Sequence, residues 1–366
     1  MHEVRHFARA SGGHRPDTIF APATGTGRAA VAIIRISGPG AHDALRALTD
    51  RRLPPWRELA LRYVKDAGGD VIDRAMVVVF PEGASYTGEA MAEIHCHGSR
   101  AVVMDLLAIL ARLPGCRLAQ PGEFTHRAFL GGRMDLSEVE GLADLISAET
   151  SEQRRRALRV HSGAVSRQTE AWRALLLRAR ALIEVTIDWA DEEVPEDVLP
   201  EVRSLLERLE KAMDAELSRA GPAERMRSGF EIAIVGPPNV GKSSLLNVIA
   251  GREAAIVSEI AGTTRDVLEV RFDLFGFPVH FLDTAGLRES EDPVEKLGID
   301  LARRRARAAD LRILMASPDT RAAGNETLWR EGDVRVWSKC DLGPGNGDVA
   351  LSTNDERGVD QLLELL

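Results

Sequence analysis

The segment FEIAIVGPPNVGKSSLLNVIA, residues 230–250, decides the fold of the last third of the chain. Its first residues, FEIAIV, are mostly apolar and predict a buried strand. Residues 236–243 fit the pattern G-x-x-x-x-G-K-S/T, and the residues after them keep helical spacing up to Gly251, a typical helix stop. A strand, a glycine-rich loop and a helix in this order predict a loop that binds phosphate groups.

The residue types in this loop are those that phosphate binding requires. Its glycines let backbone NH groups curl around the phosphates, and the N-terminus of the following helix adds positive potential. The lysine neutralises the outer phosphates, and the hydroxyl after it ligates magnesium. The predicted phosphate-binding residues are Gly236, Asn239, Val240, Gly241, Lys242, Ser243 and Ser244, with Ser243 as the magnesium ligand.

Two later motifs supply further parts of a metal and phosphate site. Asp283 follows a predicted strand at residues 279–282, so its carboxylate can hold the magnesium shell, with the NH of Gly286 near the terminal phosphate. Between the two motifs lie Thr263 and Thr264. One of these threonines can complete the metal shell when a triphosphate is bound, so we expect their segment to be a switch.

The tetrapeptide Ser338-Lys339-Cys340-Asp341 indicates which base is bound, because proteins that read guanine carry Asn-Lys-x-Asp at this place. Asp341 can accept hydrogen bonds from N1 and from the 2-amino group of guanine, a donor pair that adenine lacks. Ser338 departs from the pattern, and one lost hydrogen bond weakens binding by about 0.5 to 1.5 kcal/mol. Ser352 begins a tripeptide, Ser-Thr-Asn, at the position of a loop that backs the base. The predicted ligand is GTP with Mg²⁺.

Hydrolysis needs a device other than the one used by small GTPases. Those proteins orient the attacking water with a glutamine, and Leu287 stands at that position here. Asn239, inside the phosphate loop, is a candidate ligand for a monovalent cation that would place positive charge on the phosphates. Carboxylates that can orient water follow the second motif, and the residues alone do not select among Glu289, Glu291, Asp292 and Glu295.

The wider pattern predicts three folded parts. Residues 16–131 mix short β-rich runs with one apolar helix, at residues 101–113, which is typical of an α+β domain. Residues 132–225 have helical spacing, broken by an acidic, proline-containing turn near residues 189–200. In residues 226–366, short apolar runs alternate with helical stretches, which predicts an α/β domain with a mostly parallel sheet and helices on both faces. Residues 1–15 are expected to form a flexible tail.

Composition limits the classes of partner and the compartment. The 366 residues carry a formal net charge of -9, which argues against a globally basic nucleic-acid binder. The three cysteines, Cys96, Cys116 and Cys340, have no disulfide-like spacing, so we expect free thiols and a cytoplasmic protein. No apolar run approaches the roughly 18 residues of a membrane span, so no membrane association is expected.

Beyond the nucleotide motifs, the chain resembles the tRNA-modification GTPases of the MnmE (TrmE) type from Asp17 nearly to its end. Other GTPases share only the phosphate and base loops, so agreement elsewhere is specific. The residues that carry the resemblance are Asp17-Thr18-Ile19, Arg35-Ile36-Ser37-Gly38, Tyr86-Thr87-Gly88-Glu89, His97-Gly98, Pro121-Gly122-Glu123-Phe124, Arg127-Ala128-Phe129-Leu130, Asp135-Leu136-Ser137, Ile187-Asp188, Asp191-Glu192-Glu193, residues 251–257 and residues 261–266.

The resemblance implies a P-loop GTPase domain with a Ras-like sheet, following a folate-binding and dimerising N-terminal domain and a helical domain. It implies potassium-activated GTP hydrolysis coupled to a carboxymethylaminomethyl-type modification of the wobble uridine, position 34, of certain tRNAs. The implied donor is 5,10-methylenetetrahydrofolate or a related folate, and the implied partners are a second copy of the chain, tRNA and the flavin-containing protein MnmG.

The resemblance also implies roles for individual residues. Those roles are folate binding for Arg35, Glu93 and Arg133, potassium binding for Asn239, Ser258, Ile260 and Thr263, magnesium binding for Ser243 and Thr264, and orientation of water for Glu295.

One feature of the family is expected to be missing. Its members end in a second helical segment with a C-x-G-K tail whose cysteine is needed for modification, and the sequence stops at Leu366 without that tail. Either the sequence is a fragment, or GTP hydrolysis survives without tRNA modification. Two alternative functions stay open beside tRNA modification. The first is a folate-sensing or scaffold GTPase without modification activity, and the second is a ribosome-assembly GTPase, which would need an RNA-binding appendage.

Overall fold

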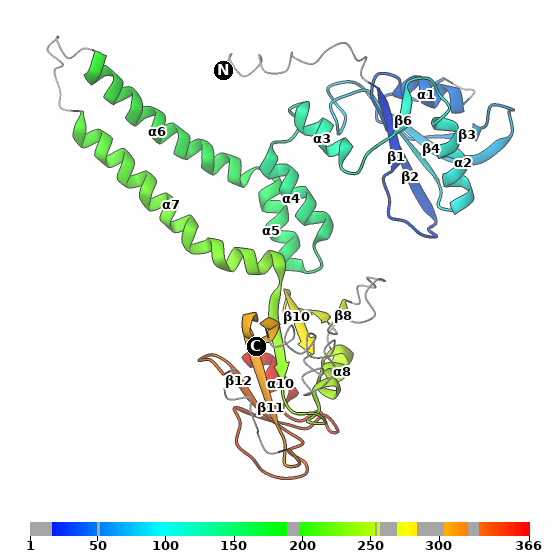
Figure 1. Cartoon of the computed structure of the whole chain (residues 1–366). Helices are drawn as coiled ribbons and strands as arrows, with labels where there is room; N and C mark the ends of the chain where they lie inside the picture. The colour runs from blue at the N-terminus through cyan, green and yellow to red at the C-terminus, as the bar shows by residue number, and fades with distance from the viewer. Residues whose placement is uncertain are drawn as a thin grey trace, which may run out of the picture. The chain divides into compact units, whose positions relative to one another are not determined.

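The computed structural model describes residues 17–49, 52–188, 198–252, 255–256, 269–283, 304–320 and 329–366. The chain divides into two compact units, Met1–Val139 and Glu140–Leu366, which are described separately (Figure 1). The first unit is α+β, and the second contains long helices followed by a largely parallel sheet. The predicted fold class is confirmed.

The first unit is built on a six-stranded sheet in the order β3-β4-β5-β2-β1-β6. All neighbouring strands are antiparallel except β1 and β6, which are parallel. The elements are β1 (Thr18–Pro22), β2 (Val31–Ser37), α1 (Ala41–Leu48), β3 (Ala60–Lys65), β4 (Val71–Phe80), β5 (Met91–His97), α2 (Arg100–Leu110), β6 (Cys116–Leu118) and α3 (Glu123–Leu130).

Alternation along the strands forms the core of this unit. On β2, Ile34 and Ile36 are fully buried, and they share one hydrophobic cluster with Leu45 of α1 and Leu106 of α2. Residues two apart on a strand point to the same face, so β2 turns one apolar row toward the helices. The opposite face of β2 then carries Arg35, between the two buried isoleucines.

An ion cluster ties α3 to the edge of this sheet. Arg117 on β6 donates to both carboxylate oxygens of Glu123 at 2.8 and 2.5 Å, and also to Asp17. Arg127 on α3 donates to Glu123 at 3.0 Å and to Asp17 at 2.7 Å. Hydrogen bonds from Arg117 are the main cause that lowers the pKa of Glu123 to about 2, against the opposing effect of burial, with help from the NH of Gln120 and from Arg127.

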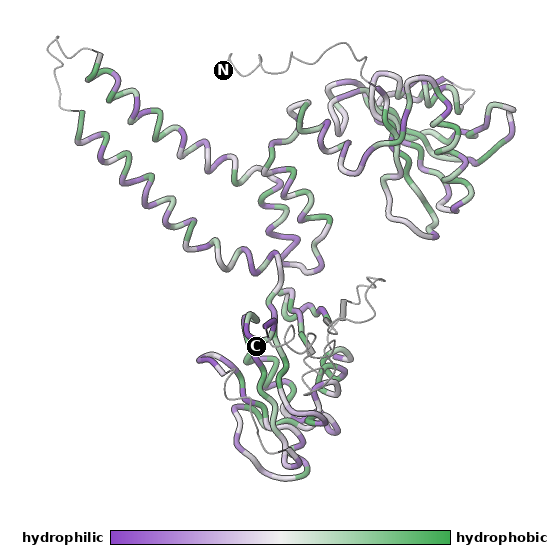
Figure 2. The backbone as a smooth tube through the Cα atoms, in the orientation of Figure 1, coloured by the Kyte–Doolittle hydropathy of each residue, from purple (hydrophilic) through white to green (hydrophobic). Residues whose placement is uncertain are grey.

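Helices occupy the described residues from 136 to 228 for most of their length, and the first helix spans the boundary between the two units. These helices are α4 (Leu136–Ser147), α5 (Ser151–His161), α6 (Ala164–Asp188) and α7 (Leu199–Ser228). Long helices α6 and α7 lie side by side and share a small apolar cluster that includes Ala179 and Val202 (Figures 1 and 2). They flank the predicted turn, most of which lies outside the described residues. In the described part of the chain, no helix is long and apolar enough to cross a membrane.

The α/β part holds a seven-stranded sheet in the order β13-β12-β11-β7-β10-β9-β8. The strands from β13 to β10 are parallel, and β9 and β8 are antiparallel additions, so the predicted, mostly parallel sheet is confirmed. The elements are β7 (Phe230–Val235), α8 (Lys242–Arg252), β8 (Ala255–Ile256), β9 (Glu269–Leu274), β10 (Phe277–Asp283), β11 (Leu311–Ala316), β12 (Val334–Ser338), β13 (Val349–Leu351) and α10 (Val359–Leu365).

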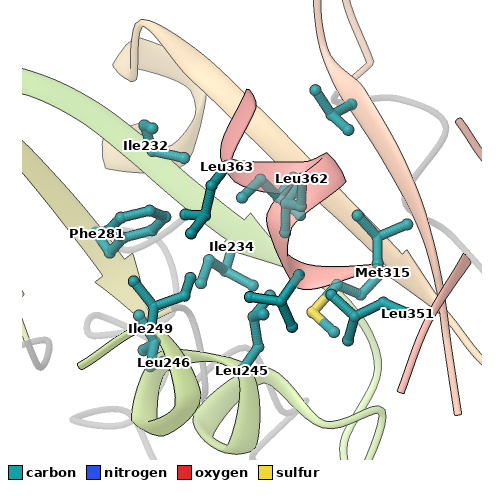
Figure 3. Packing of buried hydrophobic residues seen from close by; sticks show 14 of the residues in the cluster. Ile232, Ile234, Leu245, Leu246, Ile249, Phe281, Met315, Leu351, Leu362 and Leu363 are labelled. Atoms are coloured by element: carbon teal, nitrogen blue, oxygen red, sulfur yellow. The ribbon is translucent and has the colours of Figure 1, made fainter. Parts of the chain in front are cut away.

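Strand β7 is buried on both faces of this sheet. Ile232 and Ile234 pack in one cluster with Leu245 of α8 and Leu362 of α10 (Figure 3). The other two inner residues of β7, Ala233 and Val235, form a second cluster on the opposite face. Their partners are Ala306, within the helical residues 304–308, and Ala309, just after them. Helices therefore cover both faces of the sheet, as predicted. A strand buried in this way is a continuous apolar run, which is why its sequence shows no polar alternation.

The ion cluster of α3 predicts a pH dependence. The folded-state pKa of Glu123, about 2, lies below its ordinary value of 4.5. Its contribution to stability is therefore fully present above about pH 4.5 and is lost as the pH falls toward 2. We expect Glu123→Gln to lower the free energy of local opening of α3 at pH 7 by roughly 2 kcal/mol.

Hydrogen–deuterium exchange of peptides that span α3, corrected for the intrinsic pH dependence of exchange, measures this effect. The difference between wild type and Glu123→Gln should shrink between pH 4.5 and 2. The exposed Glu58 supplies a matched control, Glu58→Gln, with no expected change. A difference that is constant over this pH range would contradict the assignment.

Candidate functional site

A cavity of about 580 Å³ lies at the edge of the second sheet where β7, β12 and β13 end. The carboxyl ends of parallel strands meet at one edge, which is where open α/β sheets bind ligands. The structure therefore brings the predicted phosphate loop and the predicted base-reading segments to one place. The lining residues are Pro238, Asn239, Gly241, Lys242, Ser243, Ser244, Lys339, Asp341, Leu342, Thr353 and Asn354.

The phosphate end of the cavity is a tight loop between β7 and α8. Nζ of Lys242 donates to the carbonyl oxygens of Gly236 at 2.7 Å and Pro237 at 3.0 Å, so the loop encircles its own ammonium group. Asn239 and Gly241 have left-handed backbone angles, with φ of 61° and 104°. A side chain on Gly236 would place Cβ 2.9 Å from the carbonyl oxygen of Met315, so only glycine lets the loop leave β7 beside β11.

The base end of the cavity is formed by the segments after β12 and β13. Oδ2 of Asp341 accepts a hydrogen bond of 3.2 Å from Nδ2 of Asn354. Lys339 has φ of 53°, and its ammonium group forms an ion pair of 3.0 Å with Asp319. Ser338 is buried beneath the phosphate loop, where its Oγ lies 3.1 Å from the position of a Cβ on Gly241. Serine therefore stands at a buried position below the loop where the Asn-Lys-x-Asp pattern has asparagine.

Some predicted residues support the cavity without lining it, and others line it without having been predicted. Val240 and Ser352 are fully buried. The same tripeptide that contains Ser352 turns Thr353 and Asn354 toward the cavity. Asn354 could have been noticed as an amide near a base-reading carboxylate, but only the fold of the turn shows that the two side chains meet.

The structure describes only some of the predicted metal ligands. Ser243 lines the cavity in the first turn of α8. The backbone of Asp283 ends β10, in register with Ile234 of β7, so the second motif starts beside the phosphate loop. The other predicted residues of these motifs lie outside the described residues and stay predictions: Ser258, Ile260, Thr263, Thr264, Gly286, Leu287, Glu289, Glu291, Asp292 and Glu295.

The first unit holds a second group of predicted site residues. Arg35 on β2 and Glu93 on β5 are direct cross-strand neighbours, and Nε of Arg35 lies 2.9 Å from Oε1 of Glu93. The guanidinium of Arg35 lies 4.8 Å from the ring centre of Tyr86 and 5.8 Å from that of Phe124. A planar cation near two aromatic rings and beside a carboxylate offers stacking and hydrogen bonding to a flat polar ligand.

Arg133 contacts the turn that carries Tyr86, and this turn connects it to Arg35 and Glu93. Its Nη1 donates to the carbonyl oxygen of Gly83 at 3.3 Å, and its aliphatic stem packs against Gly88. Tyr86 lies in the same turn and contacts Arg35. The sequence reasoning did not assign Tyr86 or Phe124 to a site, although both stand in the family motifs and the chain contains only 2 tyrosines.

Two protein-family models match the chain. One is described as the N-terminus of the GTP-binding protein TrmE and covers residues 18–133, and the other is described as the MnmE helical domain and covers residues 136–366. The tRNA modification GTPase MnmE of Cereibacter sphaeroides is 54% identical over 351 residues, 96% of this chain and 81% of that protein. MnmE of Dinoroseobacter shibae is 52% identical over 348 residues, 95% of this chain and 80% of that protein.

A solved structure, that of Aquifex aeolicus Era bound to GDP·AlF4⁻, is similar over 37% of this chain and 54% of its own, at 26% identity and a TM-score of 0.29. The assignment of the fold rests instead on the strand order and on the loop after β7. Together with the base-reading segments, these define a P-loop GTPase domain. The chain belongs to the MnmE family, whose matched relatives are named tRNA modification GTPases.

Backbone strain in the loop predicts the effect of one methyl group. Gly241 has φ of 104° and faces Ser338 Oγ. In Gly241→Ala, the alanine would have to adopt a backbone conformation that residues with a side chain rarely adopt. We expect a loss of roughly 1–2 kcal/mol in nucleotide binding, or about 5- to 30-fold in affinity. Equilibrium titration with a fluorescent GDP analogue measures it. Gly251→Ala is the matched control, because a Cβ at Gly251 has nothing within 4 Å. Equal affinity in both variants would contradict the role of the loop conformation.

Proposed function

We propose that the chain hydrolyses GTP with Mg²⁺ and K⁺ and couples hydrolysis to a carboxymethylaminomethyl-type modification of the wobble uridine of certain tRNAs. The observation that carries this proposal is the single cavity that joins the phosphate loop to Asp341. Membership of the MnmE family supports the link to tRNA. The alternative of a scaffold GTPase predicts the same cavity and differs only in the absence of modification.

The groups proposed to bind the phosphates lie in and around the loop. Lys242 is buried and held by two loop carbonyls, so its charge is fixed where the outer phosphates would lie. Ser243 fits a magnesium ion by its hydroxyl, in the first turn of α8 and at the cavity wall. Magnesium there would neutralise the charge of the phosphate oxygens.

A potassium ion fits the loop at Asn239. This residue lines the cavity, and its left-handed backbone lets a polar side chain sit on the phosphate side of the loop. Potassium there would add positive charge beside the phosphates, where an arginine finger acts in other GTPases. Glu295 completes the proposal as the group that orients water, with Ser258, Ile260 and Thr263 as further potassium ligands and Thr264 on magnesium.

GTP turnover in potassium and in sodium tests the catalytic proposal. Wild type should turn over at least about tenfold faster in potassium. Asn239→Ala should lose that difference, and Glu295→Ala should be slow in both salts while its affinity for GDP stays unchanged. The affinity measurement separates lost catalysis from lost binding. Equal, slow rates for wild type and both variants in both salts would overturn the enzyme proposal.

The hydrogen bond between Asn354 and Asp341 predicts how a variant of Asn354 binds nucleotides. Asn354 holds one oxygen of Asp341, so it orients the carboxylate toward two donors on the base. We expect Asn354→Ala to weaken GDP binding by about 5- to 10-fold and to weaken inosine diphosphate binding less, because inosine lacks the 2-amino group. Titration with both nucleotides measures this. The exposed amide of Gln361 on α10 provides the control Gln361→Ala. Equal losses for both nucleotides would contradict an orienting role.

The proposal extends to the first unit and to partners. Arg35, Glu93 and Arg133 are proposed to bind 5,10-methylenetetrahydrofolate or a related folate, and the rings of Tyr86 and Phe124 beside Arg35 fit a flat pterin. Bound folate would supply the one-carbon unit. A homodimer through the N-terminal domain and the flavin-containing protein MnmG complete the proposed assembly. Free thiols at Cys96, Cys116 and Cys340 support a cytoplasmic location.

A further inference from the structure

A pocket in the helical part of the second unit has no role in the proposed function. It has a volume of about 260 Å³ and lies among α4, α5 and the end of α7. Its polar lining residues are Asp144, Ser147, Gln153, Arg156 and Arg227. All of them lie in described helices, and none of them lines the nucleotide cavity.

Arg156 is the unusual member of this lining. Its Nη1 is buried, yet it has no hydrogen-bond partner among the described residues. Arg156 as a whole is partly buried, and it follows Gln153 by three residues, so both side chains lie on the face of α5 that lines the pocket. A guanidinium donor without a partner is costly in a folded protein, and an anion that enters the pocket would satisfy it.

The other charges of the lining leave an excess of positive charge. Arg227 donates from Nε to Asp144 at 3.0 Å, which neutralises the one carboxylate of the pocket. Gln153 uses its carbonyl oxygen to cap α5 and donates its amide to the backbone of Arg227, so it supports the wall. The charge of Arg156 then has no counterpart in the lining. The exposed face of the same helix adds Arg154 and Arg159, which raise the local positive potential.

We propose that this pocket binds a phosphate group, with Arg156 as its main contact and Arg227 as the second cation. An arginine fork matches the oxygens of a phosphate, and the pocket has room for a tetrahedral anion. The phosphate can come from free inorganic phosphate or from the backbone of RNA, which the exposed arginines of α5 would also attract.

Thermal melting with inorganic phosphate tests the site itself. The full chain is saturated with Mg²⁺ and GDP so that phosphate cannot act at the nucleotide loop, and chloride at equal ionic strength is the reference. This design rests on the proposed nucleotide binding, and the rise in Tm caused by GDP alone checks that binding separately. We expect phosphate to raise the Tm of wild type by roughly 3 °C.

Variants assign the effect to the pocket. Arg156→Met keeps the apolar stem and should abolish the phosphate-dependent rise, whereas Arg159→Met, on the exposed face of the same helix, should retain it. Asp144→Asn removes the negative charge of the lining and should strengthen phosphate binding by about two- to fivefold. This second variant keeps the test valid if Arg156→Met folds poorly.

Binding of a tRNA transcript, followed by fluorescence anisotropy over a range of salt, separates the two sources. If the site takes an RNA phosphate, Arg156→Met weakens tRNA binding about tenfold and lowers the salt slope by about one, and inorganic phosphate competes. If it takes free phosphate, the Tm effect is lost in Arg156→Met while tRNA binding is unchanged. A wild-type Tm that does not respond to phosphate, or responds equally in Arg156→Met, would overturn the proposal.

Discussion

Burial of β7 on both faces is the constraint on which the nucleotide domain depends. Its alternate residues enter two separate hydrophobic clusters, one under α8 and α10 and one under the helical residues 304–308. A strand that is held from both sides has a fixed register, because a slip of one residue would exchange the two clusters. The end of β7 is therefore a fixed point, and the phosphate loop begins there.

The loop and the neighbouring strands then position the other residues of the cavity. The carbonyls of Gly236 and Pro237 hold Lys242, and Gly241 leaves room for Ser338 from β12. Parallel pairing then places the ends of β12 and β13 beside the loop, which brings Asp341 and Asn354 to the same cavity. Backbone contacts position these side chains, so the loop has its binding conformation before any nucleotide binds.

Local sequence patterns predicted the strand and helix around the phosphate loop, because each pattern belongs to a single element. The strand, loop and helix at residues 230–250 are adjacent in the chain, so apolar runs and glycine spacing are enough to identify them. The contact of Asn354 with Asp341 and the contacts of Arg35 with Tyr86 and Phe124 depend on turns and cross-strand pairing. Those contacts join residues far apart in the sequence, and no local pattern contains them. The division at residues 131 and 225 stays a prediction, as do the site roles taken from the family.

We propose that Asp341 makes this cavity a guanine site. Equilibrium binding of GDP, ADP and xanthosine diphosphate to wild type and to Asp341→Asn tests it most directly. Xanthine presents an oxygen where guanine presents its 2-amino group, so an amide suits xanthine and a carboxylate suits guanine. The account predicts that wild type prefers GDP over both other nucleotides by about 100-fold or more, and that Asp341→Asn prefers xanthosine diphosphate. Equal binding of GDP and ADP by wild type would contradict it.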